Sequence, residues 1–366
     1  MKIVCSKQNL VNGVSIVSKA VPNNTTMNIL ECILINASKD SITLTANDMD
    51  LGIETMIEGE TIIEGSIAIE AKMLSDVVRK LPDDDITIET NIDFETTISC
   101  GELVFRISSK PGDDFTGIPS IEKNDTISVS MLTLKDIISK TIFSIGSGDV
   151  NRIMAGAHLI IKNDQMRITT LDGHRISIRK VQLKNIYPEK DVIVPGKALS
   201  EISKIIPFDA DKDVSISLTN THALFEFDTT VVVSRLIDGN YISVDKMMSS
   251  DYETKVTVSK KNLFDCVDRS LLFSKEGNKK PIVIEINDTM MNLSVKSSLG
   301  SMNEKIDVKK QGKDIRIGFN PKFILDVLKV MDEEEIDMYF VNSKAPLYIK
   351  DASESYVYMV LPVNLS

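Results

Sequence analysis

The sequence GKALSEISKII at residues 196–206 has two counterparts in the chain, AKMLSDVVRKL at residues 71–81 and PKFILDVLKVM at residues 321–331. Consecutive copies lie 125 residues apart, and at that interval lysine aligns with lysine, acid with acid and apolar residue with apolar residue. Within each copy the apolar positions follow the period of an α-helix, and two bases seven residues apart share the opposite face. The repeat therefore predicts three domains of one design, each containing this helix.

A second amphipathic helix is predicted in each third of the chain. Ser6, Thr133 and Ser259 each precede a run of apolar residues with helical spacing, as an N-cap residue precedes a helix. Short alternating runs typical of half-buried strands lie between the helices, at residues 41–45, 85–89, 214–218 and 291–295. We expect an α+β fold of three similar domains, each with two helices and about eight short antiparallel strands.

Length and composition agree with several globular domains. The chain has 366 residues, which is too long for one ordinary hydrophobic core. Hydrophobic residues make up 42% and charged residues 26%, with a mean hydropathy of +0.01, as in soluble globular proteins. Polar stretches place the three domains at residues 1–124, 125–249 and 250–366.

The N-terminal residues and the cysteines suggest a cytoplasmic protein. The sequence MKIVCSKQNL is too polar for a signal peptide, and no apolar run reaches the length of a membrane span. The four cysteines have neither zinc-site nor disulfide-framework spacing, so reduced thiols are expected. Tryptophan is absent and aromatic residues make up 5%, which argues against stacking platforms for single-stranded nucleic acid.

Charge is distributed unevenly along the chain. The 53 acidic and 42 basic residues give a net charge of −11, and an acidic total argues against nucleic-acid binding. The predicted helical windows nevertheless sum to +9, so the rest of the chain carries −20. Bases on a single surface helix usually only face solvent, but six helices of the same sign favour a shared electropositive track that holds a phosphate backbone. The windows are residues 6–20, 72–80, 133–140, 197–204, 259–275 and 322–329.

No constellation of residues predicts catalysis. His174 and Asp172 belong to the sequence LDGHR, in which Asp-Gly is above all a turn signal, and no nucleophile motif accompanies them. The acidic turns at residues 83–85 and 332–335 lack the spacing of a calcium loop and are more typical of solvated surface. We expect a protein that is not an enzyme.

The C-terminal segment, residues 358–365, is apolar almost to its end. Chain ends are usually polar and frayed unless something holds them in place. The segment is therefore either a last strand that completes the third domain or part of an exposed apolar cleft for a partner peptide.

Five motifs, in this order on the threefold repeat, resemble those of the bacterial sliding clamps, the beta subunits of DNA polymerase III holoenzyme, over the full length of the chain. They are LDGHRI at residues 171–176, VPGK at 194–197, RLIDGNY at 235–241, FNPKFILDVL at 319–328 and LPV at 361–363. The sequence departs from the family pattern at Leu171, where threonine is usual, and at Ile242 and Ser249, where prolines are usual.

The resemblance implies that the chain is half of a head-to-tail homodimeric ring around double-stranded DNA. Clamps of this family confer processivity by tethering the replicative DNA polymerase, and they also bind other replication and repair proteins. A clamp loader complex opens and closes the ring. The family has no catalytic site, no cofactor, no metal and no membrane association, and it acts in the cytoplasm at the nucleoid.

The resemblance also implies three sets of functional residues. The DNA-facing set is Lys72, Arg79, Lys80, Lys197 and Lys204. The partner-peptide pocket comprises Met154, Leu171, Gly173, His174, Arg175, Ile176, Ile242, Met247, Met359, Val360, Leu361, Pro362 and Val363. The ring seam joins Phe105 and Ile107 of one chain to Leu272 and Phe273 of the other.

Two alternative functions remain open from the residues alone. One is a metal-dependent hydrolase that uses the acidic turns, or Asp172 with His174. The other is a protein-binding scaffold that does not bind DNA. The first needs carboxylates that converge on a cation, and the second needs a docking surface without a basic track.

Overall fold

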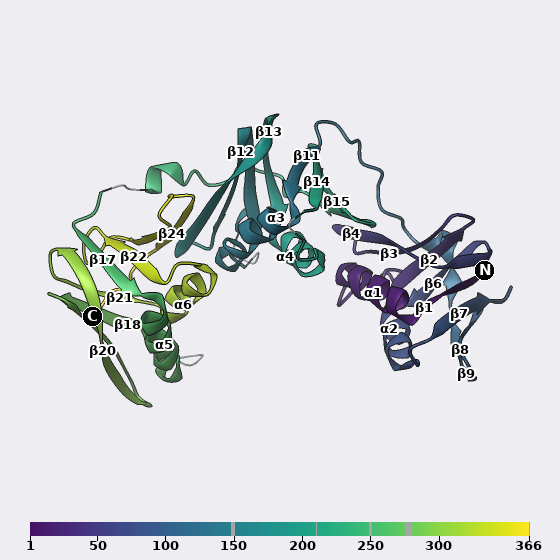
Figure 1. Cartoon of the computed structure of the whole chain (residues 1–366), viewed down its shortest axis with the longest axis horizontal. Coiled ribbons are helices and arrows are strands. Elements are labelled where there is room, and N and C mark those ends of the chain that lie inside the picture. Colours follow the sequence, from purple (N-terminus) through teal and green to yellow (C-terminus); the bar gives the residue numbers. More distant parts are fainter. Residues whose placement is uncertain (148–150, 210, 249–250, 275–279, 366) are drawn as a thin grey trace. The chain divides into compact units, whose positions relative to one another are not determined.

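The computed structural model describes residues 1–147, 151–209, 211–248, 251–274 and 280–365 (Figure 1). The chain forms two compact units. Unit 1 comprises Met1–Leu132 and Ser200–Leu236, and unit 2 comprises Thr133–Leu199 and Ile237–Ser366. The middle third of the chain therefore contributes to both units. The predicted boundary at residues 249–250 lies outside the described residues.

Unit 1 contains two antiparallel sheets. The first has the order β5 (Glu60–Ile63), β1 (Lys2–Ser6), β7 (Asp85–Thr90), β8 (Glu95–Cys100) and β9 (Leu103–Ser108). The second has the order β10 (Lys110–Pro111), β6 (Gly65–Glu70), β2 (Cys32–Ser38), β3 (Ser41–Asn47), β4 (Leu51–Ile57), β16 (Thr230–Arg235), β15 (His222–Phe227), β14 (Asp213–Leu218) and β11 (Ile127–Ser130). Pairing of β4 with β16 joins the first third of the chain to the middle third, and the hydroxyls of Thr55 and Thr230 lie 2.9 Å apart across this joint.

Unit 2 is built on one antiparallel sheet. Its order is β12 (Gly156–Leu171), β13 (Arg175–Pro195), β24 (Tyr356–Val360), β23 (Leu347–Lys350), β22 (Glu335–Phe340), β17 (Thr254–Ser259), β20 (Gly300–Gly312), β19 (Met290–Ser297), β18 (Ile282–Asn287) and β21 (Ile315–Phe319). Pairing of β13 with β24 joins the middle third to the last third, so the same kind of joint occurs in both units.

The three repeated segments form helices in matching positions. These are α2 (Ala71–Lys80), α4 (Gly196–Ile205) and α6 (Pro321–Val330), which confirms the prediction from the repeat. Helices α1 (Lys7–Val17), α3 (Met131–Ser139) and α5 (Lys260–Ser270) precede them in each third. Short 3-10 turns complete the helical elements, at η1 (Ser18–Ala20), η2 (Gly112–Asp114), η3 (Ile142–Ser144), η4 (Arg152–Ala155), η5 (Asp245–Met247) and η6 (Leu271–Phe273).

The helix starts agree with two of the three predicted caps. Ser6 accepts a hydrogen bond from the Asn9 N–H, and Ser259 accepts one from the Asn262 N–H. The prediction that Thr133 begins a helix is wrong, because α3 begins at Met131 and Thr133 lies inside it. Met131 is fully buried, so the apolar face of the helix begins two residues before Thr133.

Each third holds its first helix in the same way. The first backbone N–H of that helix donates to a carbonyl in the turn that follows the second helix. The N–H of Lys7 donates to Asp84 at 3.1 Å, that of Met131 to Lys212 at 3.0 Å and that of Lys260 to Glu334 at 2.8 Å. The three thirds therefore share one plan beyond their sequence repeat.

The number of strands differs between the thirds. In the described residues, the segments 1–124, 125–249 and 250–366 contain ten, six and eight strands. The middle third has fewer because β12 and β13 run for 16 and 21 residues, with register shifts where shorter strands would otherwise end. Among the described helices none is both long enough and apolar enough to cross a bilayer.

The helices pack one face onto the sheets and leave the other exposed. Leu74, Val77 and Val78 of α2 are buried, as are Ile324 and Val327 of α6. In unit 1, α1 and α2 lie side by side, and in unit 2 α5 and α6 do the same (Figure 1). The lysines and arginines of these helices are thereby directed to the surface.

Candidate functional site

An apolar pocket of 370 Å³ opens on unit 2. It lies where β12 ends, β13 begins and β24 ends, beside the segment that precedes η5. Its lining residues are Met154, Leu171, Gly173, His174, Arg175, Ile176, Ile242, Met247, Pro346, Met359 and Leu361. Ten of these belong to the set that the resemblance implied, so widely separated segments of the sequence meet at one cavity.

Three residues of the implied set lie elsewhere. Val360 is fully buried in the core of the last third, and Pro362 is not part of the pocket wall. The Val363 N–H donates to the Gly318 carbonyl at 2.8 Å, which directs this residue toward β21. Alternation of an extended chain places Val360 and Pro362 on the face opposite Met359 and Leu361, whereas Val363 is held away from the pocket by its bond to Gly318.

Sequence reasoning missed Pro346 in the pocket wall. This residue immediately precedes β23, which pairs with β24. No motif or period in the sequence marks it. Only the pairing of β23 with β24 brings Pro346 next to Leu361, so a prediction of strand order would have been needed to find it.

The turn between β12 and β13 forms one wall of the pocket. The Asp172 carboxylate accepts hydrogen bonds from the backbone N–H groups of His174 at 3.0 Å and Arg175 at 3.1 Å. Gly173 has φ of +86°, a left-handed conformation that suits glycine. This side-chain-closed turn fixes the position of the His174 ring, which is exposed at the pocket and stacks on Phe323 with ring centroids 6.1 Å apart.

Arg175 lines the pocket and holds its wall in place through hydrogen bonds to neighbouring segments. Its guanidinium is buried and donates to the carboxylates of Asp172 and Asp326, both at 2.8 Å, and to the Phe143 carbonyl. It also lies over the Phe323 ring, 4.3 Å from the centroid. Burial opposes the charge, but Tyr358 and the two carboxylates raise the pKa of Arg175 above its usual value. Arg175 therefore ties the β12–β13 turn to α6.

This arrangement bears on the idea of an acid–base pair. The Asp172 carboxylate is engaged by Arg175 and by the turn, and no hydrogen bond joins it to the His174 ring in the described structure. Within the described ranges no three His, Cys, Asp or Glu side chains are grouped closely enough to hold a metal ion. The geometry of this turn is that of a wall that shapes an apolar cavity.

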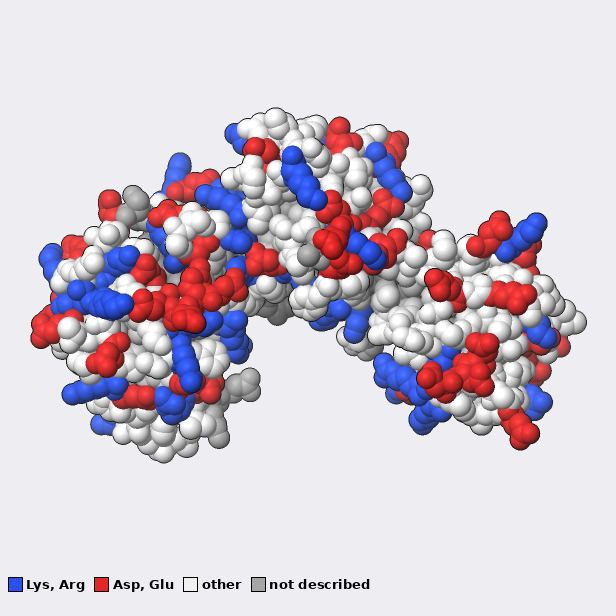
Figure 2. Space-filling model, in the orientation of Figure 1, with Lys and Arg blue, Asp and Glu red and all other residues white. Residues whose placement is uncertain are grey.

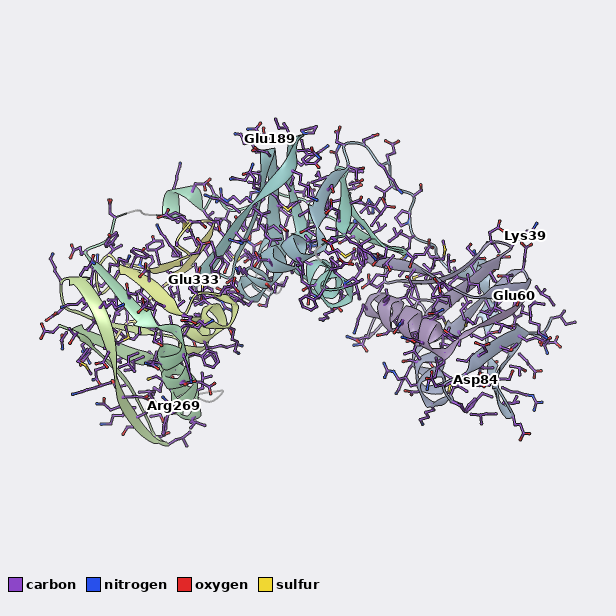
Figure 3. The ribbon with its side chains drawn as sticks, viewed as in Figure 1. Lys39, Glu60, Asp84, Glu189, Arg269 and Glu333 are labelled. Carbon is purple, nitrogen blue, oxygen red and sulfur yellow. The ribbon has the colours of Figure 1, made fainter. Side chains whose placement is uncertain are left out.

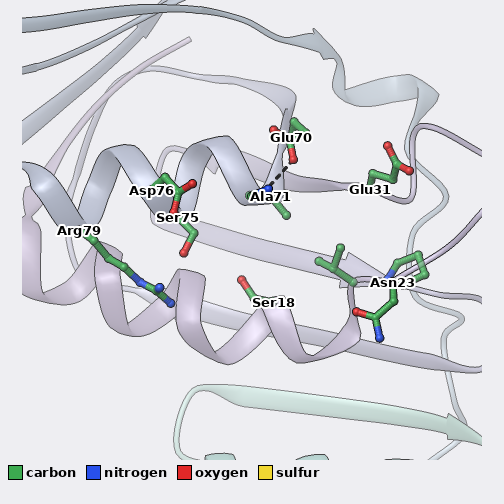
Figure 4. A pocket seen from close by; sticks show the side chains of 11 residues that line it. Ser18, Asn23, Glu31, Glu70, Ala71, Ser75, Asp76 and Arg79 are labelled. Atoms are coloured by element: carbon green, nitrogen blue, oxygen red, sulfur yellow. Dashed lines mark hydrogen bonds between the residues drawn. The ribbon is translucent and has the colours of Figure 1, made fainter.

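A second recess, of 490 Å³, lies between α2 and the end of α1 in unit 1 (Figure 4). Unlike the apolar pocket, it is lined mainly by polar and charged side chains. Ser75 and Arg79 of α2 face Ser18 across it, and Glu70 caps α2 by accepting from the Lys72 and Met73 N–H groups. Lys72 and Arg79 of the predicted DNA-facing set both line this recess.

The basic residues of α2 and α4 are all exposed. Lys72, Arg79 and Lys80 of α2 have no ion pair in the described part of the chain. On α4, Lys204 pairs with Glu201 at 2.7 Å, and Lys197 is also exposed. In the space-filling view, lysines and arginines gather near α2, beside acidic side chains (Figure 2).

Not every base in the helical windows is free. Lys140 is buried and bonded to both Asp136 and Asp332, and the Arg269 Nε of α5 donates to Glu304 at 3.0 Å. The net +9 counted from sequence therefore overstates the unpaired positive charge. The acidic turns lie beyond the second helices, as Asp84 and Glu333 show in Figure 3.

The predicted seam residues lie on an edge strand of unit 1 and on a 3-10 turn of unit 2. Phe105 and Ile107 are half-buried on β9, an edge strand whose Leu103 and Val104 are exposed. Leu272 and Phe273 belong to η6, and Leu272 is 64% exposed. Near η6, residues 300–307 of β20 pair with β19 on one side, with no described strand on the other.

Comparisons with known proteins find matches along the whole chain. Family models of the DNA polymerase III beta subunit match residues 1–119 (N-terminal domain), 128–243 (central domain) and 246–364 (C-terminal domain). A beta sliding clamp of Staphylococcus aureus is 30% identical, over 94% of each chain. The crystal structure of a putative DNA polymerase III beta subunit from Eubacterium rectale is 56% identical, with TM-score 0.95 over 100% of both chains. A sliding clamp from Bacillus subtilis is 31% identical, with TM-score 0.94 over 100% of both.

Proposed function

The chain belongs to the family of DNA polymerase III beta subunits, the beta sliding clamps, and we propose that it is a processivity factor that encircles duplex DNA. The observation that carries this proposal is the presence of all three family domains, in order, on a chain with basic helix faces. A closed ring tethers a replicative DNA polymerase by topology, so the clamp itself needs no catalytic site and no cofactor. Its place of action is the cytoplasm, at the nucleoid.

The domains extend over residues 1–124, 125–249 and 250–366 in this proposal. The first boundary falls in the gap between the matched segments 1–119 and 128–243. The second falls just inside the segment that begins at residue 246.

The proposed DNA-facing surface consists of Lys72, Arg79 and Lys80 on α2 with Lys197 and Lys204 on α4. All five are exposed on helix faces opposite the buried apolar residues, and Lys72 with Lys197 and Arg79 with Lys204 occupy equivalent positions of the repeat. Exposed lysines and arginines attract the phosphate backbone but do not read the nucleobases, which suits a protein that slides. The bases of α2 contribute most, because Lys204 is already paired with Glu201.

The proposed ring closes by pairing two copies of the chain head to tail. Strand β9 offers an edge with exposed Leu103 and Val104, next to Phe105 and Ile107. Residues 300–307 of β20 offer a second edge, near Leu272 and Phe273. An exposed strand edge presents unpaired backbone N–H and C=O groups that tend to pair with another chain. Pairing β9 of one copy with β20 of the other satisfies both edges.

The apolar pocket of unit 2 is the proposed docking site for short apolar segments of partner proteins. Its walls are apolar except for His174 and Arg175, and Leu361 at its rim is 39% exposed. The replicative polymerase, the clamp loader complex and other replication and repair proteins are the proposed users of this one site. Because each chain carries one pocket, a dimeric ring has two.

The alternatives have no comparable support. A metal-dependent hydrolase needs convergent carboxylates, whereas Asp172 is engaged by Arg175 and the acidic turns are spread over the surface. A scaffold that does not bind DNA leaves the aligned bases of α2 and α4 without a role.

The deciding experiment uses nicked circular DNA. After loading by a clamp loader complex, the protein is expected to co-elute with the circle and to be released when the circle is cut once with a restriction enzyme. Equal retention on circular and linear DNA would contradict topological linkage. Failure to load, together with a 40.6 kDa monomer at micromolar concentration in ultracentrifugation, would contradict the ring itself.

A further inference from the structure

A smaller recess of 220 Å³ lies on the same face of the unit 2 sheet as the apolar pocket. Its floor is formed by Ile178 of β13, Val357 of β24 and Tyr348 of β23. Met248, next along the chain to Met247 of the apolar pocket, also lines the recess. The Tyr348 hydroxyl donates to the Met247 carbonyl at 3.0 Å, so the two cavities are separated only by this contact and its neighbours.

Strand register gives the spacing between the two cavities. Ile176 of the apolar pocket pairs with Met359, and Ile178 of the recess pairs with Val357, so the cavities follow one another along β13 and β24. Lys180 lies four residues beyond Ile176 on the same face and pairs with Arg167 of β12. Four residues of strand span about 13 Å.

The charges of the recess are arranged with bases inside and acids outside. The side chain of Arg167 is 18% exposed and that of Lys350 is 13% exposed. Their partners are exposed at the rim, Asp245 to 73% and Glu354 to 68%. The recess therefore contains more positive charge at its base than at its mouth.

Two basic groups retain donors for a further acceptor. The ammonium group of Lys180 makes no ion pair or hydrogen bond in the described residues, although its charge, after that of Arg167, helps to lower the pKa of Asp245 at the rim. The buried Nε–H of Arg167 has no acceptor in the described part of the chain, since only its Nη2 donates to Asp245, at 2.7 Å. An unpaired base beside an apolar floor favours a carboxylate carried on an aliphatic stem.

We propose that this recess binds an acidic side chain of the same partner segment whose apolar anchor occupies the pocket, four residues away along an extended peptide. The proposal rests on the proposed function, because it requires that the pocket bind peptides. The ligand chemistry is that of glutamate or aspartate: the carboxylate contacts Lys180 in the field of Arg167 and Lys350, and its methylene groups contact Ile178 and Val357. Partners with this acid would be selected over partners with only the anchor.

The test uses synthetic peptides with a pair of leucines as anchor and one Glu four residues before or after it, since an extended peptide can run in either direction. Each is compared by fluorescence anisotropy with a Gln peptide and with a peptide whose Glu is three residues from the anchor. In one of the two directions, the Glu peptide is expected to bind about two- to fivefold more tightly than both. The Lys180→Gln variant is expected to abolish the advantage, and 0.5 M salt to reduce it.

Lys296→Gln is the matched control, because Lys296 is an exposed lysine on β19 outside both cavities. An advantage of Glu that persists in Lys180→Gln, or that is equal at three and four residues, would overturn the proposal while leaving the pocket intact. A short single-stranded oligonucleotide that displaces the Glu peptide but not the Gln peptide would instead assign the recess to phosphate. If none of these peptides binds the unmodified protein, the pocket is not a peptide site and this inference fails with it, whereas encirclement of DNA is tested separately by the nicked circle.

Discussion

The apolar pocket of unit 2 and the polar recess beside α2 in unit 1 are cavities of similar size with opposite construction. The pocket is shaped by five separate segments and rests on Arg175, whose charge is satisfied inside the protein. The recess is lined by one side of α2, by the segment that follows α1 and by Glu31, and its bases have no ion pairs in the described structure. The first depends on the integrity of the fold, whereas the second depends on charge.

The contrast explains why the two surfaces should respond to different perturbations. The apolar pocket is shaped by packing, so salt should not affect it, but loss of a side chain that holds its wall should distort it. Exposed charge on a helix is screened by salt, yet each base can be replaced with little loss of stability.

Replacing Arg175 by methionine should have the largest effect. It leaves the carboxylates of Asp172 and Asp326, each 15% exposed, without their partner. Breaking a buried ion pair in this way costs about 3–5 kcal/mol, which corresponds to a fall of roughly 6–20 °C in the melting temperature of unit 2. The Arg79→Met variant, in which an exposed base is removed, should melt within about 2 °C of the unmodified protein. Equal melting temperatures for both variants would show that Arg175 does not support the fold.

Replacing Leu361 by alanine should weaken binding of an apolar peptide about tenfold, because the leucine side chain forms part of the pocket wall. Isothermal titration calorimetry measures the affinity, and ultracentrifugation should show an unchanged dimer. Val363→Ala is the control, since Val363 is similarly exposed and nearby but does not line the pocket. If both variants bind equally well, the peptide does not use this cavity.

Replacing both Lys72 and Arg79 by alanine should change the salt dependence of DNA binding. Each lost phosphate contact reduces the slope of log K against log salt by about 0.9, so the double variant should lose about 1.8 in all. Titrations of a short duplex at several salt concentrations give the slope. Lys39→Ala, at an exposed turn between β2 and β3, is the control and should leave the slope unchanged. Peptide affinity should not change in either variant.

Thiol labelling should show the smallest effect, because all four cysteines are buried. Burial, helped by the nearby Asp85 carboxylate, raises the pKa of Cys5 to about 12, and burial together with Glu304 raises that of Cys266 to about 12. These thiols stay protonated at pH 8, and no rapid reaction with Ellman's reagent is expected in the native protein. In rising urea, labelling of Cys5, Cys32 and Cys100 reports on unit 1 and labelling of Cys266 on unit 2, so identifying the labelled thiols compares the two units. Immediate labelling of either thiol would contradict its burial.

The second helix of each third could be predicted because its information is local. The eleven consecutive residues 71–81 contain both the apolar residues at helical spacing and the bases of the opposite face. The structure confirms the helix there. The strand at residues 214–218 was predictable for the same reason, since it alternates strictly. The helix start at Thr133 was predicted wrongly because a cap signal rests on a single residue. The buried Met131, two residues earlier, is already part of the helix.

Long-range contacts could not be predicted from such patterns. The bond between Arg175 and Asp326 joins residues 151 apart, and nothing in either local sequence specifies the other. The resemblance supplied Arg175 as a pocket residue but not the reason for its burial. Pro346 and the recess around Lys180 depend on which strands are neighbours, which is a property of the sheet and not of any one segment.

The joints between consecutive thirds of the chain are made by main-chain hydrogen bonds, β4 with β16 and β13 with β24. Main-chain groups are the same in every residue, so these joints place few demands on the side chains, and their sequences are free to diverge. The same feature makes an excised middle third a hazard. Cut free at both ends, it would expose the edges of β16 and β13 as templates for any extended polypeptide, and self-association is its expected fate.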